Sequence, residues 1–363
     1  MPSTTPVTWR NALEPRALVE QFIAHPPEGF SCGLSGAGTP WFLAQFDLLT
    51  TLDEPLRRRL RATRLHRLIG HWLRWRTVFV GATVSEYLPA PAGLAADRLL
   101  ADLWVGDAGR LRRRHPLLII KDIPTESPLL PAVDVAAARA LVASLQLAGY
   151  VLIEGQALAW VPIDFDSMDG YLARLSYQRR KNIRRKLRSR AQLDIECLAT
   201  GDAALSDAGM RGQLYALYLQ VYAQSEIHFD RLTQAFFDAA WQDAGSAGRL
   251  FIYREGERIV GWNMCYQVGE SLVDKFIGLD YERAHALNLY VVSWMHNLDY
   301  ARRSGLRQYV AGWTDPQVKA QLGARFTFTR HAAYPRSPVL RWLLRRMAGV
   351  FEGDRSWHAQ HDR

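Results

Sequence analysis

The sequence predicts an α/β (α+β) protein in which mixed central sheets are flanked by helices. The stretch "HPLLIIKDIP" (115–124) is a short, continuously apolar run between turn signals, as expected for an interior strand. A helical pattern follows at 135–148, ended by Gly149, and then the strand-like "YVLIEG" (150–155). Strand, helix and strand in this order indicate a βαβ-type unit.

The first half contains two further expected strands. "PWFLAQFDLLTTLDEPLRRRL" (40–60) predicts an extended run followed by a helix with its N-cap at Thr51 or Asp53. "TVFVGATVSEYLP" (77–89) is β-branched and ends in proline, which predicts a strand that leads into a loop.

The second half predicts a similar alternation of helices and strands. Helical patterns cover about 208–245, and a glycine-centred turn at "REGER" predicts a hairpin. A helix over 287–303, ended by Gly305, has one apolar face. The remaining expected strands are 249–269 (interrupted by the hairpin turn), 271–280, 306–313 and 324–334.

The chain of 363 residues is long enough for two domains, each with its own core. We expect an N-terminal half over 1–165, a second domain over 166–335, and a cationic amphipathic helix and tail over 336–363. The basic helix that opens the second domain has Asp166 or Ser167 as its expected N-cap.

Positive charge is concentrated in two segments. The net charge is +9, and the acid-free stretches 57–76 and 170–190 contain many of the arginines and lysines. Such clusters indicate anionic partners, although solvated helix faces produce the same pattern. On a helical wheel, Arg179 falls within the apolar stripe of the second stretch. It is therefore expected to point inward, toward an anionic ligand or toward a carboxylate such as Asp166 or Glu196.

Several classes of protein are disfavoured. The three cysteines are far apart and predict a reducing compartment without disulfides. No Cys/His spacing suggests a metal, no signal peptide is recognisable, and no window of about 20 residues is free of charge. We therefore expect a cytoplasmic protein without a metal. A pure nucleic-acid binder is disfavoured because the basic stretch 175–190 contains a single aromatic residue.

Two segments resemble a known family. "DGYLARLSYQRRKNIRRKLRSRAQLDIE" resembles the basic helix of FemAB-like and peptidoglycan biosynthesis/recognition acyltransferases. "ALNLYVVSWMHNLDYARRSGLRQYVAGWTDPQVKAQLGARF" resembles their closing section, in which a helix, a strand and a lysine-bearing turn follow one another. The resemblance covers about 115–335. It implies a tandem pair of GNAT-like (acyl-CoA N-acyltransferase) domains, the first of them degenerate, that transfers an acyl or aminoacyl group to an amine.

The resemblance also implies where the donor binds. The pantetheine of acyl-CoA, or of an acyl carrier protein, is expected between strands 271–280 and 306–313, as a co-substrate and not as a permanently bound cofactor. The sequence departs from the family in two places. "DYERAHALN" contains no glycine where GNAT enzymes have a pyrophosphate loop, and the closing-turn lysine, Lys319, has Val318 and Leu322 as neighbours. The expected binding residues are Ile277, Gly278, Leu279, Arg283, Asn288 and Arg179.

The catalytic base has four candidates. Glu226 and His228 lie in "SEIHFD" between two helical stretches, and a histidine has a pKa suited to deprotonating an ammonium. Asp274 interrupts an apolar strand, where a charge needs a partner. Glu86 stands at the end of an expected strand in the first half. Each of them can equally be structural, so the alternatives stay open.

The acceptor is expected to be an amine, and two features favour a lipid. Segment 338–351 places Val339, Leu343 and Leu344 on one side and Arg341 and Arg345 on the other, the pattern of an interfacial helix. Segment 64–79 mixes tryptophans with arginines, as expected near lipid headgroups. The chain is similar in this respect to bacterial ceramide synthases, which join acyl-CoA to a sphingoid base. That likeness implies an enzyme bound peripherally to the inner face of the membrane.

Two other functions remain. A Fem-type enzyme would take an aminoacyl group from tRNA, whose phosphates would occupy the basic groove. A non-catalytic binding protein on a GNAT fold would need no acyl donor at all.

Overall fold

The computed structural model describes residues 8–48, 74–225 and 228–347. The chain forms two compact units. Unit 1 consists of Met1–Ala12, Phe22–Ala157 and Thr327–Arg363, and unit 2 consists of Leu13–Gln21 and Leu158–Phe326. Two of the divisions between the units fall at 157/158 and 326/327, eight and nine residues before the boundaries expected after residues 165 and 335. None of the described helices is long and apolar enough to cross a membrane.

Unit 1 is built on a mixed sheet in the order β2-β3-β4-β6-β13-β7. The pairs β2–β3, β3–β4 and β6–β13 are antiparallel, and β4–β6 is parallel. The strands of this sheet are β2 (Ser31–Leu34), β3 (Pro40–Asp47), β4 (Arg74–Val80), β6 (Leu117–Glu126), β7 (Val151–Pro162) and β13 (Arg325–Pro335). Strands β1 (Trp9–Arg10) and β5 (Ala90–Pro91) pair antiparallel in a separate two-stranded sheet.

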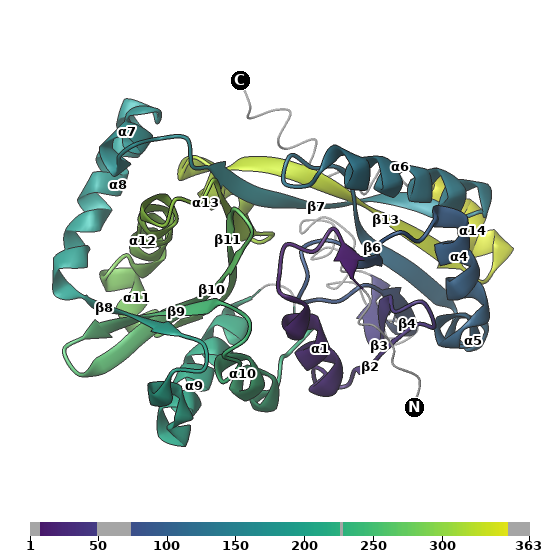
Figure 1. Cartoon of the computed structure of the whole chain (residues 1–363), viewed down its shortest axis with the longest axis horizontal. Coiled ribbons are helices and arrows are strands. Elements are labelled where there is room, and N and C mark those ends of the chain that lie inside the picture. Colours follow the sequence, from purple (N-terminus) through teal and green to yellow (C-terminus); the bar gives the residue numbers. More distant parts are fainter. Residues whose placement is uncertain (1–7, 49–73, 226–227, 348–363) are drawn as a thin grey trace, which may run out of the picture. The chain divides into compact units, whose positions relative to one another are not determined.

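Helix α6 (Ala132–Leu147) packs on β6 (Figure 1). Its buried residues Val135, Ala138, Leu141 and Leu145 recur every three or four positions and therefore share one face. Helix α4 (Ala96–Val105) packs against α6. The unit also contains helices α5 (Asp107–Arg114) and α14 (Pro338–Met347).

Unit 2 contains the strand order β7-β12-β11-β10-β9-β8. Figure 1 shows α9 and α10 on one side of these strands and α11 and α12 on the other. Its strands are β8 (Asp194–Ala199), β9 (Gly248–Glu255), β10 (Arg258–Val268), β11 (Ser271–Leu279) and β12 (Gln308–Gly312). Its helices are α7 (Met168–Ala173), α8 (Tyr177–Lys186), α9 (Ala208–Gln224), α10 (Gln234–Trp241), α11 (Tyr281–Ala286), α12 (Leu289–Arg303) and α13 (Pro316–Gln321), while α1 (Arg16–Ala24) begins in this unit.

The predicted mixed sheet with flanking helices is confirmed, as are most of its elements. The hairpin between β9 and β10 has its turn at Gly256, where φ is +57°. Gly305, with a φ of +69°, follows the end of α12. The predicted βαβ unit needs one correction, because β13 from the end of the chain lies between β6 and β7. The helix expected after Thr51 or Asp53 lies outside the described residues.

Candidate functional site

Strands β11 and β12 pair over a short distance only. Their parallel ladder joins residues 271–273 to residues 308–310. Beyond it, β11 continues to Leu279 with β10 as its ladder partner, and no described strand pairs with its other edge. This open edge begins at Asp274, so the backbone of residues 274–279 keeps hydrogen-bonding groups directed toward the side of β12.

An irregularity in β11 sets the direction of Asp274. Cys265 of β10 is opposite Asp274, while the preceding Met264 is opposite Phe276, so Lys275 is an extra residue. An insertion of this kind is a β-bulge, which redirects side chains. Phe276 packs against the rings of Phe236 and Phe237 in α10, whereas Asp274 contacts α12 and β12. The bulge therefore brings Asp274 to the side of the sheet that α12 covers.

Three side chains donate hydrogen bonds to the Asp274 carboxylate. The Tyr309 hydroxyl and Asn297 Nδ2 each lie 2.9 Å from Oδ2. Asn263 Nδ2 lies 3.3 Å from both carboxylate oxygens. These donors come from β12, α12 and β10 and are fully or almost fully buried, while Asp274 itself is only partly buried.

Lys319 is the positive charge of this site. It is 4 % exposed in α13, and its Nζ donates to the carbonyl oxygen of Ala311 at 2.6 Å. Gly312 follows with a φ of +76°, a conformation that favours glycine, and a Cβ there would lie 4.0 Å from Lys319 Nζ. The turn at Gly312 thus lies directly beside the lysine. We call Asp274, Asn263, Asn297, Tyr309 and Lys319 the Asp274 cluster.

The electrostatics of the cluster favour a carboxyl group that can take up a proton. Burial raises the pKa of Asp274, and the hydrogen bonds from Tyr309 and Asn263 and the charge of Lys319 oppose that rise only in part. Burial and the neighbouring Asp274 raise the pKa of Tyr309 well above its usual value, so its hydroxyl remains a donor. A carboxyl with a raised pKa is a suitable general base for an ammonium group.

Two buried acceptors in the cluster lack a donor. The Oδ1 atoms of Asn263 and Asn297 have no hydrogen-bond partner within the described part of the chain. Each amide donates its Nδ2 hydrogens to Asp274, which directs Oδ1 elsewhere. Buried amide oxygens normally accept a hydrogen bond, so a ligand with several N–H donors would complete both residues.

Lys275 has a separate partner. Its Nζ lies 3.0 Å from Glu14 Oε1, and the two side chains are 5 % and 2 % exposed. Both charges that interrupt the apolar strand are therefore accommodated, Asp274 by the cluster and Lys275 by an ion pair.

The predicted donor-binding residues lie along and beyond β11. Ile277, Gly278 and Leu279 form its last three positions, with Gly278 against the ring of Trp262. Arg283 makes a two-pronged ion pair with Glu255, with 2.8 Å between Nε and Oε2, so its guanidinium is already occupied.

Asn288 precedes α12 in a left-handed conformation with φ +50°, and the helix begins at Leu289 instead of the predicted position 287. The Asn288 side chain makes no cap hydrogen bond to the helix. It therefore shapes the entry into α12 through its backbone.

The prediction that Arg179 points inward is wrong. The wheel assumed one continuous helix, but α7 ends at Ala173 and a new helix begins after the N-cap Ser176, so the two apolar stripes are not in phase. Arg179 is exposed, and its Nη1 lies 3.4 Å from the carbonyl oxygen of Ala320. Ser167 is an N-cap, but of the short helix α7, whereas the basic helix α8 has Ser176 as its N-cap.

Neither expected carboxylate partner of Arg179 pairs with it. Glu196 pairs with Arg254 at 3.6 Å, and the backbone of Asp166 accepts a hydrogen bond from Arg302. Because Arg179 is exposed, it does not need the buried anion that an inward position would require.

His228 and Glu86, two of the other candidate bases, are not part of the cluster. His228 is exposed in the loop after α9, where its ring meets Tyr222 edge-on at 5.1 Å. Glu226 lies outside the described residues. Glu86 is 2 % exposed in unit 1, in the loop that follows β4.

The sequence analysis missed Asn263, Asn297 and Tyr309. Each interrupts an apolar segment, in "VGWNMCY", "WMHNL" and "QYVAG", and this is the same signal that marked Asp274. Asparagines on the buried face of an expected helix or strand could have been identified as polar partners of a buried carboxylate.

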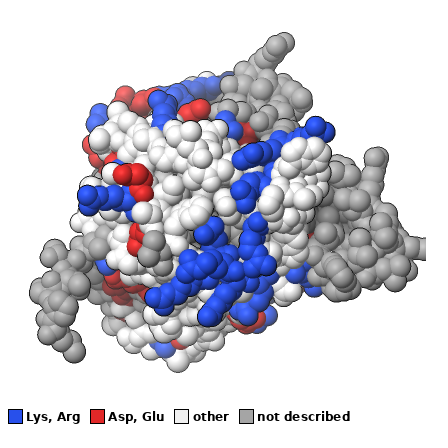
Figure 2. Space-filling view, turned by 90° about the vertical axis from the view of Figure 1, so that its right-hand side faces the viewer, with Lys and Arg blue, Asp and Glu red and all other residues white. Residues whose placement is uncertain are grey.

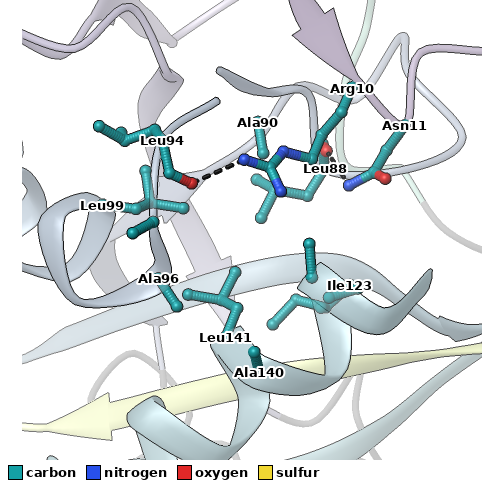
Figure 3. Close-up of a pocket in the computed structure, with 13 residues that line it drawn as sticks. Arg10, Asn11, Leu88, Ala90, Leu94, Ala96, Leu99, Ile123, Ala140 and Leu141 are labelled. Atoms are coloured by element: carbon teal, nitrogen blue, oxygen red, sulfur yellow. Dashed lines mark hydrogen bonds between the residues drawn. The ribbon is translucent and has the colours of Figure 1, made fainter. Parts of the chain in front are cut away.

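A separate cavity of about 260 Å³ lies in unit 1 (Figure 3). Its lining is mostly aliphatic and alanine-rich. Arg10 Nη2 donates to the carbonyl of Leu94 at 2.6 Å, and Asn11 Nδ2 donates to that of Leu88 at 3.3 Å. None of the described residues that line this cavity is a carboxylate or a histidine, so the Asp274 cluster is better suited to acid–base chemistry. The lining residues are Arg10, Asn11, Leu88, Ala90, Leu94, Ala95, Ala96, Leu99, Ile123, Ala137, Ala138, Ala140 and Leu141.

Comparison with solved structures identifies proteins of the same fold. L-PGS from Bacillus licheniformis aligns with a TM-score of 0.53 and 10% identity, over 94% of this chain and 98% of its own. The C-terminal domain of a proposed lysylphosphatidylglycerol synthetase from Agrobacterium fabrum aligns with a TM-score of 0.54 and 10% identity, over 91% and 95%. FemX aligns with a TM-score of 0.50 and 10% identity, over 91% and 98%. At these identities the likeness concerns the fold alone.

Comparison of sequences defines the family. No curated protein sequence matches the chain significantly. The profile of the FemAB-like family, described as peptidoglycan biosynthesis/recognition, matches residues 135–340, more than half of the 363 residues. The chain therefore belongs to the FemAB-like family.

Proposed function

We propose that the chain is an N-acyltransferase that moves an acyl or aminoacyl group to a primary amine at the Asp274 cluster. The observation that carries this proposal is the arrangement around Asp274: a carboxyl with a raised pKa lies beside two buried amide oxygens that have no donor among the described residues. A primary ammonium has three N–H donors. It can therefore donate one hydrogen bond to the Asp274 carboxylate and one to each of the two Oδ1 atoms.

In the proposed reaction Asp274 acts as the general base. It removes one proton from the bound ammonium, and the nitrogen lone pair then attacks the carbonyl carbon of the donor. A C–N bond forms and the bond to the leaving group breaks, which is C–S in a thioester and C–O in an aminoacyl-tRNA ester. The leaving group departs with the electron pair and takes up a proton that the nitrogen loses. Lys319 is placed to stabilise the negative charge that develops on the carbonyl oxygen.

The donor is proposed to lie along the open edge of β11. The unpaired backbone groups of residues 274–279 would hold the pantetheine amides of acyl-CoA or of an acyl carrier protein. Because Arg283 is paired with Glu255, donor phosphates would rely on other groups, unless that ion pair opens.

Aminoacyl-tRNA is an equally serious donor. The family description refers to peptidoglycan biosynthesis, and a protein of similar fold is a proposed lysylphosphatidylglycerol synthetase. Both descriptions favour an acceptor in the cell wall or the membrane. A sphingoid base, the acceptor of a ceramide synthase, belongs to the same class of membrane amines and remains a specific proposal, as does a peripheral position on the inner face of the membrane.

The direct test is a transfer assay with two classes of donor. Purified protein is incubated with acyl-CoAs of increasing chain length and with amines that include sphingoid bases, and the released thiol is followed. A parallel series uses charged tRNA and follows loss of the aminoacyl ester. Amine-dependent turnover in one series, abolished by Asp274→Asn but not by the exposed Asp194→Asn, is the expected result. Absence of turnover in both series would instead favour a non-catalytic binding protein.

A further inference from the structure

Helix α14 is attached to unit 1 through its arginines. Arg341 donates from Nε and Nη2 to the carbonyl oxygen of Pro335 at 3.3 and 3.1 Å, and its guanidinium lies 4.0 Å from the ring centroid of Tyr334. Arg345 donates to the carbonyl oxygen of Gly149 at 3.3 Å. The basic side of the helix therefore faces the body of the unit.

Three apolar side chains on the opposite side of α14 are left exposed, while Leu340 and Leu344 are half-buried. Val339 is 72 % exposed, Trp342 is 54 % exposed and Leu343 is 45 % exposed. Arg346, one turn further along the same side, lies 4.3 Å from the ring centroid of Trp342. We call these four residues the α14 face. A surface helix normally turns its apolar side inward, so this orientation requires an explanation.

Exposed arginines lie next to the α14 face. Arg336, directly before the helix, donates from Nη1 to the carbonyl oxygen of Arg113 at 2.8 Å. Burial lowers the pKa of His115, and so do the charges of Arg76 and Arg114, which therefore both lie near this histidine. No carboxylate from the described ranges pairs with Arg76, Arg113, Arg114 or Arg336, which we call the flanking arginines.

Figure 2 views the molecule from the side that carries α5 and α14 in Figure 1. Lys and Arg side chains gather near the centre of this face, and few acidic side chains lie among them. White, uncharged surface borders this positive group directly.

We propose that the α14 face and the flanking arginines form a docking surface for an anionic phospholipid bilayer. Trp342, Leu343 and Val339 would enter the boundary between headgroups and acyl chains, where tryptophan and aliphatic side chains are favoured. The flanking arginines would bind the lipid phosphates, since no carboxylate in the described part of the chain pairs with them. The exposure of these three side chains follows from this role, because they must remain free to enter the membrane.

An RNA surface is the other anionic candidate, and the α14 face disfavours it. RNA binding places bases on aromatic side chains. Here Val339 and Leu343 provide no stacking platform, and Arg346 already covers one face of the Trp342 ring.

The test compares the binding of the whole protein to vesicles of phosphatidylcholine alone and of phosphatidylcholine mixed with phosphatidylglycerol, by co-sedimentation. We expect binding to the mixed vesicles that weakens with salt. Trp342→Ala/Leu343→Ser should weaken it about tenfold or more, because two side chains that enter the bilayer are lost. Arg113→Gln/Arg114→Gln should also weaken it and should flatten the salt dependence.

Two substitutions serve as controls. Val133→Ser removes an apolar side chain that is also 72 % exposed but lies on α6, and Arg307→Gln removes an exposed arginine of unit 2. Neither should alter vesicle binding. Equal binding to both kinds of vesicle, or unchanged binding by Trp342→Ala/Leu343→Ser, overturns the proposal, and so does arginine-dependent binding of tRNA without vesicle binding.

The result can be separated from the proposed enzymatic function. Transfer to a water-soluble amine should be unaffected by Trp342→Ala/Leu343→Ser. Loss of vesicle binding with intact transfer would support the docking surface whatever the natural acceptor is, and unchanged melting temperatures would exclude unfolding as the cause.

Discussion

Asp274 is the residue on which the proposed chemistry depends most. A general base is inactive when it is protonated. Because the pKa of Asp274 is raised, activity should be lost on acidification at a higher pH than with an ordinary aspartate. We expect Asp274→Asn to lower kcat by about 10²- to 10⁴-fold, the range typical for loss of a general base. Asp194→Asn, an exposed change on β8, should leave kcat unchanged. An unaltered kcat in Asp274→Asn would remove Asp274 from the mechanism.

The same residue should make stability depend on pH. Because the folded-state pKa of Asp274 is raised, the folded protein binds this proton more tightly than the unfolded chain does. Its contribution is therefore fully present below the ordinary pKa of an aspartate and is lost as pH rises through the raised value. Denaturant unfolding of the parent and of Asp274→Asn should differ in slope against pH only within this window. Parallel curves would contradict the raised pKa.

Tyr309 adjusts the basicity of Asp274. Burial raises the pKa of Asp274, and the hydrogen bond from the Tyr309 hydroxyl is the strongest of the interactions that lower it. Tyr309→Phe should raise that pKa further, so the acid limb of the pH–rate profile should move to higher pH. Tyr215→Phe in α9, which removes a hydroxyl that donates to the carbonyl oxygen of Leu232, is the matched control. A profile that stays in place in Tyr309→Phe would exclude this role.

At the scale of the element, strand β11 is fitted tightly against β10. A Cβ on Gly278 would lie 2.2 Å from Nε1 of Trp262, whose N–H donates to Leu214 in α9. Gly278→Ala should lower the free energy of unfolding by about 1–3 kcal/mol, since neither the ring nor the strand has room to move. Gly212→Ala in α9, where the new methyl group meets nothing within 4 Å, should instead stabilise by about 0.5–1 kcal/mol. Chemical denaturation midpoints of the two variants should therefore shift in opposite directions.

Periodicity and turn chemistry predicted most of the elements but not their interruptions. Apolar runs and glycines located β6, α6, the hairpin at Gly256 and the end of α12, because these signals are local. The break between α7 and α8 depends on Ser176 as a second N-cap, and the wheel for Arg179 failed there. The bulge at Lys275 depends on pairing with β10, which a single strand does not reveal. Asp274 was therefore a recognisable candidate, while the three donors around it emerged only from the packing.

At the scale of the whole molecule, each compact unit is assembled from segments that are distant in sequence. Unit 2 includes Leu13–Gln21, although the rest of it begins at Leu158. The Lys275–Glu14 ion pair joins the two segments, and Gln21 Nε2 adds a hydrogen bond to Asp243 Oδ2 at 3.2 Å. A single cut in the chain consequently cannot yield a complete unit 2.

This arrangement predicts how the ion pair contributes to stability. Glu14→Ala should lower the free energy of unfolding by about 3–5 kcal/mol, because it removes one partner of an almost fully buried pair. Glu14→Leu/Lys275→Met should restore most of that loss, since no charge then remains to be desolvated. The exposed pair Arg307–Glu270 is the control, and Glu270→Ala should cost at most about 1 kcal/mol. If Glu14→Ala and Glu270→Ala destabilise equally in urea, the N-terminal segment does not stabilise unit 2 through this contact.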